Sequence, residues 1–212
     1  MIITLFKNDD HERFVRAFED AVVSERAGTI DWKPDPNAQA REAGAFVGWL
    51  TSTGSVSSIL VDEPCSDVMS KIAAKLQGPR INVFFQEKMI WEFGLICDGL
   101  LRVKFSVAPE EWGEVDPKRY VGTPADLAEL WSVPIERIER YMVNWQPTEV
   151  WNPEVEMMTR SYLLEGQKAY PEDQYGYGEM YQGLDFIRAL GGENPQQGSK
   201  FWVYLPPPKP RR

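Results

Sequence analysis

The segment 81–107 constrains the fold more than any other part of this sequence. Large apolar residues alternate with other residues along three runs, at 81–86, 89–97 and 101–107. Asp98-Gly99 separates the last two runs, and this pair suits the two positive-φ positions of a type I′ hairpin turn. Period-two alternation is typical of strands with one buried face. We therefore predict a central β-meander at 81–107 that is covered on one side.

Helices and further strands are predicted on both sides of the meander. Apolar residues at helical spacing, and capping residues before several of them, predict helices at 10–26 and 66–77, two that begin at Pro124 and Pro134, and two more at 154–167 and 184–190. Short apolar runs predict strands at 2–6, 45–51, 57–62 and 201–205, and the proline-containing segment 29–41 is predicted as a loop.

These elements define an α+β protein. We expect a mixed or mostly antiparallel sheet of five to seven strands, with helices mainly on one face and a largely helical C-terminal part. The predicted organisation is an α+β core at 1–145, a helical and loop extension packed on it at 146–205, and a flexible tail at 206–212.

Composition and net charge bear on the cellular location of the protein and on the kind of partner it can bind. The chain of 212 residues carries a formal net charge of −9, which repels phosphate backbones and anionic membranes and favours a basic protein partner. Its start has no basic region followed by a long apolar run, and no stretch is apolar enough for a membrane-spanning helix. Two cysteines do not make a disulfide framework. We expect a cytoplasmic protein, and the sequence does not indicate its oligomeric state.

Several chemistries lack their sequence patterns. Cys65, Cys97 and His11 are scattered, so no zinc-type spacing exists and no metal site is predicted. A single histidine and the absence of a Gly-x-Ser-x-Gly elbow argue against a serine triad, and the acids around Cys65 argue against a nucleophilic thiol. No nucleotide-binding loop is present, so no cofactor is predicted.

Glu92 is the acid with the clearest claim to a pocket. It lies inside an aromatic strand, so covering its face would raise the pKa of its carboxyl and make it a candidate for acid–base chemistry. If that face is open, Glu92 follows ordinary polar-out alternation, which the pattern favours. A carboxylate-dependent enzyme with a pocket over the meander is therefore the second functional hypothesis.

The segment 124–143 has the apolar spacing of a helix-turn-helix unit. Its second helix would carry Glu136 and Glu139 against Arg137 and Arg140, and so it has no net positive charge. A protein that reads DNA needs several cations near phosphates. DNA binding is therefore the third hypothesis, behind a helical pair that packs on the meander.

The Tyr/Gly loop, which spans residues 170–182, is the first candidate for a binding surface. Tyrosines offer a large contact area at low entropic cost, and nearby acids suit a basic partner. The candidate residues are Tyr170, Glu172, Asp173, Tyr175, Tyr177 and Tyr181, together with Trp112 from the preceding loop. The alternative is that this loop forms no binding surface and packs its aromatic rings onto its own domain.

Three groups of residues in this order resemble a family of uncharacterised bacterial proteins, over about residues 80–192. The groups are Phe105-Ser106 with Pro109 and Trp112-Gly113; Leu127-Ala128, Val133-Pro134 and 138–141; and 170–173 with Asp185-Phe186 and Leu190-Gly191. The resemblance implies a bacterial cytoplasmic origin and carries no activity with it.

The first functional hypothesis is accordingly a non-catalytic protein-binding module with an acidic, Tyr-rich surface. An immunity-type or toxin-neutralising role fits a small acidic bacterial protein, although only by analogy.

Overall fold

A computed structural model describes residues 1–26, 28–32, 45–61, 66–86, 90–109, 121–154, 156–162 and 164–204. Contacts divide the chain into two compact units: Met1–Asn82, Ile96–Leu100 and Gly191–Arg212 form the first, and Val83–Leu95 and Leu101–Leu190 form the second. The tail expected at 206–212 and the candidate residue Trp112 lie outside the described residues. The domain boundary expected after residue 145 stays a prediction.

In the first unit, five strands pair antiparallel in the order β2-β10-β3-β4-β1. They are β1 (Ile2–Lys7), β2 (Thr29–Asp31), β3 (Ala45–Thr53), β4 (Val56–Val61) and β10 (Ser199–Tyr204). The four strands predicted in these regions are confirmed, whereas β2 arises inside a predicted loop, where its three residues pair with β10. A short 3-10 turn, η5 (Pro195–Gln197), precedes β10.

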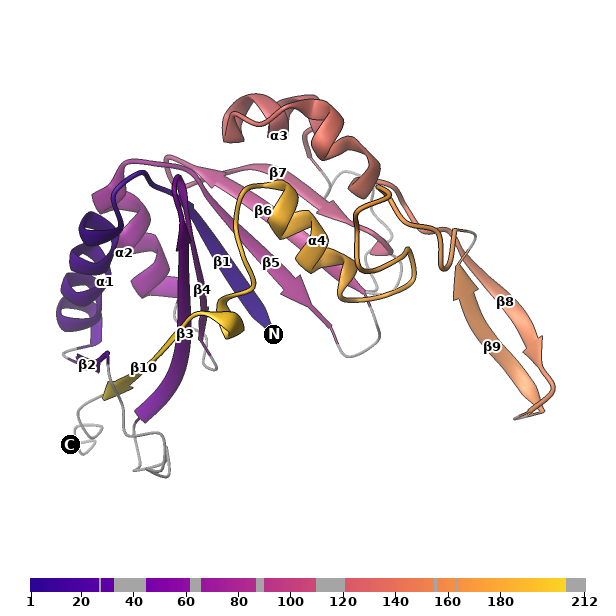
Figure 1. Cartoon of the computed structure of the whole chain (residues 1–212), viewed down its shortest axis with the longest axis horizontal. Coiled ribbons are helices and arrows are strands. Elements are labelled where there is room, and N and C mark those ends of the chain that lie inside the picture. Colours follow the sequence, from indigo (N-terminus) through magenta and orange to yellow (C-terminus); the bar gives the residue numbers. More distant parts are fainter. Residues whose placement is uncertain are drawn as a thin grey trace. The chain divides into compact units, whose positions relative to one another are not determined.

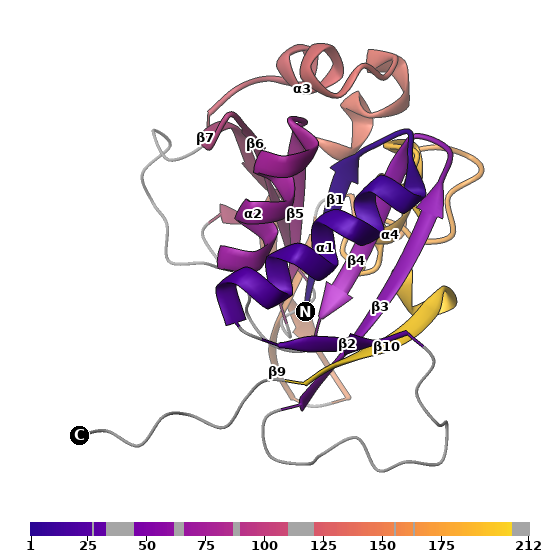
Figure 2. The same cartoon turned by 90° about the vertical axis from the view of Figure 1, so that its left-hand side faces the viewer.

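Helices α1 (His11–Arg26) and α2 (Ser66–Leu76) lie side by side over one face of these strands (Figures 1 and 2). Both were predicted, and their apolar stripes build the core of the first unit. The Phe18 ring lies 5.9 Å from the Trp32 ring and 5.3 Å from the Phe201 ring. Phe201 is paired across the strands with Gly48, where a Cβ would come within 2.2 Å of the Phe201 ring, so this contact requires glycine.

The predicted meander forms as β5 (Arg80–Phe85), β6 (Trp91–Cys97) and β7 (Leu100–Ser106). Asp98 and Gly99 adopt φ angles of 51° and 76°, as a type I′ turn requires. The buried face predicted from the alternation is present, since Trp91, Phe93 and Leu95 of β6 are all buried.

Helix α3 (Pro124–Trp131) begins as predicted. Thr123 Oγ1 accepts a hydrogen bond from the Asp126 N–H, and the Asp126 carboxylate accepts one from the Thr123 N–H, which is a capping box. The helix ends at Ser132, whose φ of 54° is left-handed. The helix predicted from Pro134 was wrong.

Two 3-10 turns, η3 (Ile135–Arg137) and η4 (Glu139–Tyr141), replace that helix. Ile138 interrupts them with a φ of −128°, outside the helical region, and its buried side chain is anchored in the core. Packing of Ile138 and Tyr141 therefore decides the backbone here, more than the helical spacing of the sequence does.

The helix predicted at 154–167 was also wrong. Residues Pro147–Asn152 and Met157–Tyr162 instead form an antiparallel hairpin of strands β8 and β9. Asn152 starts the connecting turn, because its side chain accepts the Glu154 N–H at 2.9 Å. Residues 157–162 alone resemble a helix. They form a strand here because they pair with the Thr-Glu-Val-Trp run of β8, in which threonine, valine and tryptophan favour strands.

After residue 145, the α-helical structure of the described residues is the eight-residue α4 (Gln182–Ala189), so the expectation of a largely helical C-terminal part was wrong. α4 covers the meander in the second unit: the Phe186 ring stacks on Trp91 at 5.0 Å and on Phe93 at 4.8 Å. Gly183 permits this close approach, since a Cβ there would lie 2.6 Å from the Phe85 ring.

The α+β class with an antiparallel sheet is confirmed. Among the described residues, five antiparallel strands form in the first unit, and the meander adds β5, β6 and β7. Within the described part of the chain, no helix is long and apolar enough to cross a membrane.

Candidate functional site

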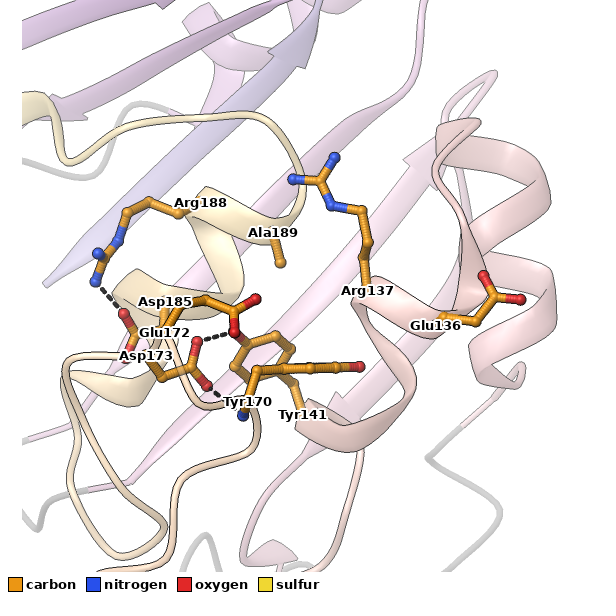
Figure 3. A pocket seen from close by; sticks show the side chains of 9 residues that line it. All are labelled: Glu136, Arg137, Tyr141, Tyr170, Glu172, Asp173, Asp185, Arg188 and Ala189. Carbon is orange, nitrogen blue, oxygen red and sulfur yellow. Dashed lines mark hydrogen bonds and ion pairs between the residues drawn. The ribbon is translucent and has the colours of Figure 1, made fainter.

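A pocket of about 360 Å³ lies in the second unit (Figure 3). Its walls come from three segments far apart in the sequence, which are η3 with η4, the start of the Tyr/Gly loop, and α4. The lining residues are Glu136, Arg137, Tyr141, Tyr170, Glu172, Asp173, Asp185, Arg188 and Ala189. Three predicted binding residues, Tyr170, Glu172 and Asp173, are therefore brought together in one place.

Asp173 is the buried centre of this pocket. One carboxylate oxygen accepts a hydrogen bond from the Tyr141 hydroxyl at 2.5 Å, and the other accepts the Tyr170 N–H at 3.0 Å. Burial raises the pKa of the Asp173 carboxyl, and the two hydrogen bonds oppose that rise. Burial and the adjacent Asp173 raise the pKa of the Tyr141 hydroxyl, so Tyr141 stays a neutral donor.

Asp185 projects from the first turn of α4 and holds a second set of contacts. One carboxylate oxygen forms an ion pair with Arg188 on the same helix, and the other accepts the Tyr175 N–H at 2.8 Å. Asp185 therefore fixes the Tyr/Gly loop to α4, and the favourable position of an acid near a helix N-terminus supports this arrangement.

Arg140 fastens the other end of the loop. Its guanidinium donates to the Ala169 carbonyl at 3.3 Å and lies 5.3 Å from the centre of the Tyr170 ring. The Arg140 carbonyl accepts the Tyr177 hydroxyl at 2.6 Å. Burial raises the pKa of both tyrosine hydroxyls, Tyr170 and Tyr177.

The remaining predicted residues are placed less favourably for a shared surface. Tyr177 is buried, and Tyr175 is half-buried with its ring 5.5 Å from that of Tyr181. Tyr181 is the exposed tyrosine of the loop. Glu92 lies outside this pocket, and its carboxylate is 3.9 Å from the ammonium of Lys104 on the neighbouring strand. Whether any of these residues bind a ligand stays a prediction.

Six pocket residues were missing from the predicted set: Glu136, Arg137, Tyr141, Asp185, Arg188 and Ala189. Tyr141 and Arg137 lie on the helix predicted from Pro134, and Arg188 lies on the helix predicted at 184–190. Asp185 had a usable signal, because an acid at the start of a short predicted helix is well placed to bind the N–H groups of a preceding loop. Within the described residues, Arg137 forms no ion pair.

The hairpin surface is the second candidate, and we define it as Val150, Trp151, Met157 and Met158. Each of these side chains is 50–56% exposed. The strand register pairs Trp151 with Met158, while Val150 and Met157 face the other side. The base of the hairpin is fixed, since the Tyr162 ring packs on the buried Trp145 ring at 5.2 Å. Figure 1 shows β8 and β9 as a two-stranded arm.

The base of the hairpin also adjoins the Tyr/Gly loop. The turn after β9 meets the loop through two backbone hydrogen bonds, from Gly166 N–H to the Tyr177 carbonyl at 2.9 Å and from Tyr177 N–H to the Gln167 carbonyl at 2.8 Å. Gly176 packs against Gly166 so closely that a Cβ would lie 2.9 Å from its carbonyl carbon. The hairpin is therefore rooted in a part of the chain that is internally well bonded.

Among the described residues, no group of three or more His, Cys, Asp and Glu side chains is arranged to hold a metal ion. No protein-family model, curated protein or solved structure matches the chain. The resemblance to an uncharacterised bacterial family over residues 80–192 stays a prediction.

Proposed function

We propose that this protein is a non-catalytic module that binds a basic protein partner through the hairpin surface. The observation that carries the proposal is the exposure of the cross-strand pair Trp151 and Met158 on one face of the hairpin, with Val150 and Met157 exposed on the other face. Clustered exposed apolar residues mark interaction sites, and tryptophan and methionine are enriched where proteins meet.

The architecture of the arm adds a second argument. An isolated two-stranded hairpin is marginally stable in water, and it gains stability when a face is covered. Trp151 and Met158 form a cross-strand pair without a covering layer among the described residues. A partner that packs over this pair would supply the missing layer.

Charge selects the kind of partner. The segment 147–162 contains three glutamates, Glu149, Glu154 and Glu156, all exposed, and one arginine. With a whole-chain charge of −9, a second copy of this protein would meet like charge at this surface. A partner with an apolar patch surrounded by basic residues would complement both the exposed apolar side chains and the negative charge of the hairpin.

The Tyr/Gly loop contributes less to this proposal than its composition predicts. Tyr170, Tyr177 and Asp173 make internal contacts, which leaves Tyr181 and Glu172 as its exposed candidates. A toxin-neutralising role is the form of the proposal that suits an acidic protein acting on a basic toxin, and it rests on analogy.

A comparative capture experiment tests the proposal. Tagged wild-type protein, the double variant Trp151→Ala/Met158→Ala and the control Val23→Ala, which truncates an exposed apolar residue on α1, are used to recover proteins from the native host. A protein retained by wild type and control but lost by the double variant is then purified, and its affinity is measured directly. We expect a basic protein whose binding weakens at least about tenfold in the double variant and also weakens with salt.

Equal affinity of the purified partner for wild type and the double variant would contradict the proposal. Self-association of the wild type in sedimentation, lost in the double variant, would replace the basic partner with a second copy. Recovery of an acidic partner would contradict the inference that the negative charge of the hairpin selects a basic partner.

A carboxylate-dependent enzyme remains the second candidate, and one observation favours it. Asp173 is a buried acid with a raised pKa in a pocket that also contains Asp185. Both carboxylates already accept hydrogen bonds or ion pairs from the protein, which fits a fastening role better. DNA binding is not proposed, because the second helix of the expected helix-turn-helix is replaced by η3 and η4.

A further inference from the structure

The hairpin surface carries apolar side chains on both of its faces, and the two faces are exposed to the same extent. Trp151 and Met158 on the first face are 56% and 50% exposed, and Met157 and Val150 on the second face are also 56% and 50% exposed. Val150 pairs with Thr159, so Met157 is its diagonal neighbour across the strands. An antiparallel sheet commonly buries one face and leaves polar residues on the other. Apolar residues on both faces therefore need cover on both.

The turn that joins the two strands carries acids. Glu154 and Glu156 are both exposed there, and we call this pair the acidic tip. The turn has a defined conformation, because Asn152 accepts the Glu154 N–H at 2.9 Å and Glu156 adopts a left-handed φ of 51°. The arm thus presents a charged tip followed by an apolar middle, in a fixed order. Such preorganisation lowers the entropic cost of binding.

One face of the arm is too small to form a stable interface by itself. Each strand has six residues, so the arm is about 20 Å long and about 10 Å wide, and one face covers on the order of 200 Å². A stable protein–protein interface buries about 800 Å² on each partner. Contact with both faces and the tip comes several times closer to that area than contact with one face.

We propose that the hairpin inserts into a cleft of its basic partner, with apolar walls of the cleft against both faces and basic residues at the floor around the acidic tip. Insertion rests on the proposed function, because the same hairpin surface meets the same partner. Opposite charges at the tip and the floor favour entry of the arm, and the apolar side chains behind the tip then lose their exposure and hold the complex.

Docking on one face is the competing arrangement. A flat partner would cover Trp151 and Met158 and leave Val150 and Met157 in water. The chain itself contains reporters for the two arrangements, because Met157 and Met158 are neighbours in sequence, lie on opposite faces and carry the same thioether.

Peroxide footprinting measures the cover of each face. Hydrogen peroxide transfers one oxygen to an exposed thioether and is itself reduced to water, and mass spectrometry measures the sulfoxide formed. Met157→Leu and Met158→Leu leave one reporter each, and the probe is the purified partner from the capture experiment. Serum albumin at equal mass replaces the partner in the control. We expect oxidation of both reporters to slow at least about fivefold with the partner and to be unchanged with albumin.

A polar variant of the second face tests the same point by affinity. Val150→Thr/Met157→Gln makes this face polar and keeps a β-branched residue at position 150, as a strand favours. We expect it to weaken binding of the purified partner at least about tenfold, as Trp151→Ala/Met158→Ala does on the first face.

A third variant tests the acidic tip. Glu154→Gln/Glu156→Gln should slow association with the partner and reduce its dependence on salt, since attraction between opposite charges acts mainly on the association rate. Glu136→Gln/Glu139→Gln is the matched control, because it removes two exposed acids elsewhere in the second unit and changes the net charge equally. The control should associate as the wild type does.

Protection of Met158 alone, or wild-type affinity of Val150→Thr/Met157→Gln, overturns insertion and leaves the proposed function standing. Wild-type affinity of both face variants, or recovery of no partner, overturns insertion and the proposed function together. A second copy of the chain as the occupant, detected by sedimentation, would overturn the basic cleft. Equal effects of the tip variant and its control would contradict a basic floor.

Discussion

The Tyr/Gly loop and the β8–β9 hairpin have similar compositions but differ in how far their large side chains are exposed. Both combine large side chains with acids, and both belong to the second unit. In the loop, Asp173 and Tyr177 are buried and hydrogen-bonded to the protein itself. In the hairpin, Trp151 and Met158 are about half exposed. Exposure after folding, more than composition, separates a scaffold segment from a surface that needs a partner.

The comparison also assigns different roles to the acids. Asp173 and Asp185 act inward and fasten the loop to η4 and α4. Glu149, Glu154 and Glu156 are exposed on the hairpin. Substitutions behind the loop should therefore change the free energy of unfolding, and substitutions on the hairpin should change binding.

The largest effect is expected for Phe186→Ala. This fully buried ring stacks on Trp91 and Phe93 and meets Tyr141, so its removal leaves a cavity under the loop. We expect a loss of about 3–5 kcal/mol in unfolding free energy, measured by urea denaturation. Phe186→Leu should lose less, and equal losses would show that ring volume is not what supports the loop.

A smaller loss is expected for Tyr141→Phe. The change removes the hydroxyl that donates to Asp173 and leaves a buried carboxylate with the Tyr170 N–H as its remaining donor in this network. The expected loss is roughly 1.5–3 kcal/mol at neutral pH. Tyr181→Phe, which alters an exposed hydroxyl, is the matched control and should unfold like the wild type. A similar loss in both variants would argue against the internal role of Asp173.

The pH dependence of this difference follows from the Tyr141 pKa. Burial raises the folded-state pKa of Tyr141, so its stabilising contribution is fully present below the unfolded value near 10 and is lost as pH rises above it. The stability gap between wild type and Tyr141→Phe should therefore narrow above about pH 10. A gap that widens in alkaline solution would reverse the sign and contradict burial of the neutral hydroxyl. Urea titrations of both proteins at a series of pH values measure this difference in unfolding free energy.

The smallest effect on stability is expected for the hairpin surface. Trp151→Ala/Met158→Ala removes side chains that are about half exposed, so unfolding free energy should change by no more than about 0.5 kcal/mol per substitution. Denaturation of the same protein used for capture provides the measurement. A large loss would mean that these side chains belong to the fold and would remove the distinction between the two regions.

Sequence patterns predicted best where one local rule decides the structure. Alternation and Asp98-Gly99 predicted the meander, and Thr123 with Pro124 predicted the start of α3. They failed at the hairpin, because the fate of 157–162 depends on a partner strand ten residues earlier and not on its own spacing. The two 3-10 turns were missed because Ile138 and Tyr141 are held by core packing.

The candidate sites were harder to predict than the fold. Part of the pocket around Asp173 could be anticipated, since Tyr170, Glu172 and Asp173 are neighbours in the sequence. Tyr141 and Asp185 join them only through tertiary contacts.

The position of β10 has a consequence for how the protein is made. This strand lies between β2 and β3, although more than 140 residues separate it from either in sequence. Until residues 199–204 have emerged from the ribosome, β2 and β3 lack their shared neighbour, and the core around Phe18 lacks Phe201. The N-terminal segment must therefore wait with an open sheet edge and a partly uncovered aromatic core, and this interval is when a nascent chain of this protein most needs chaperone protection.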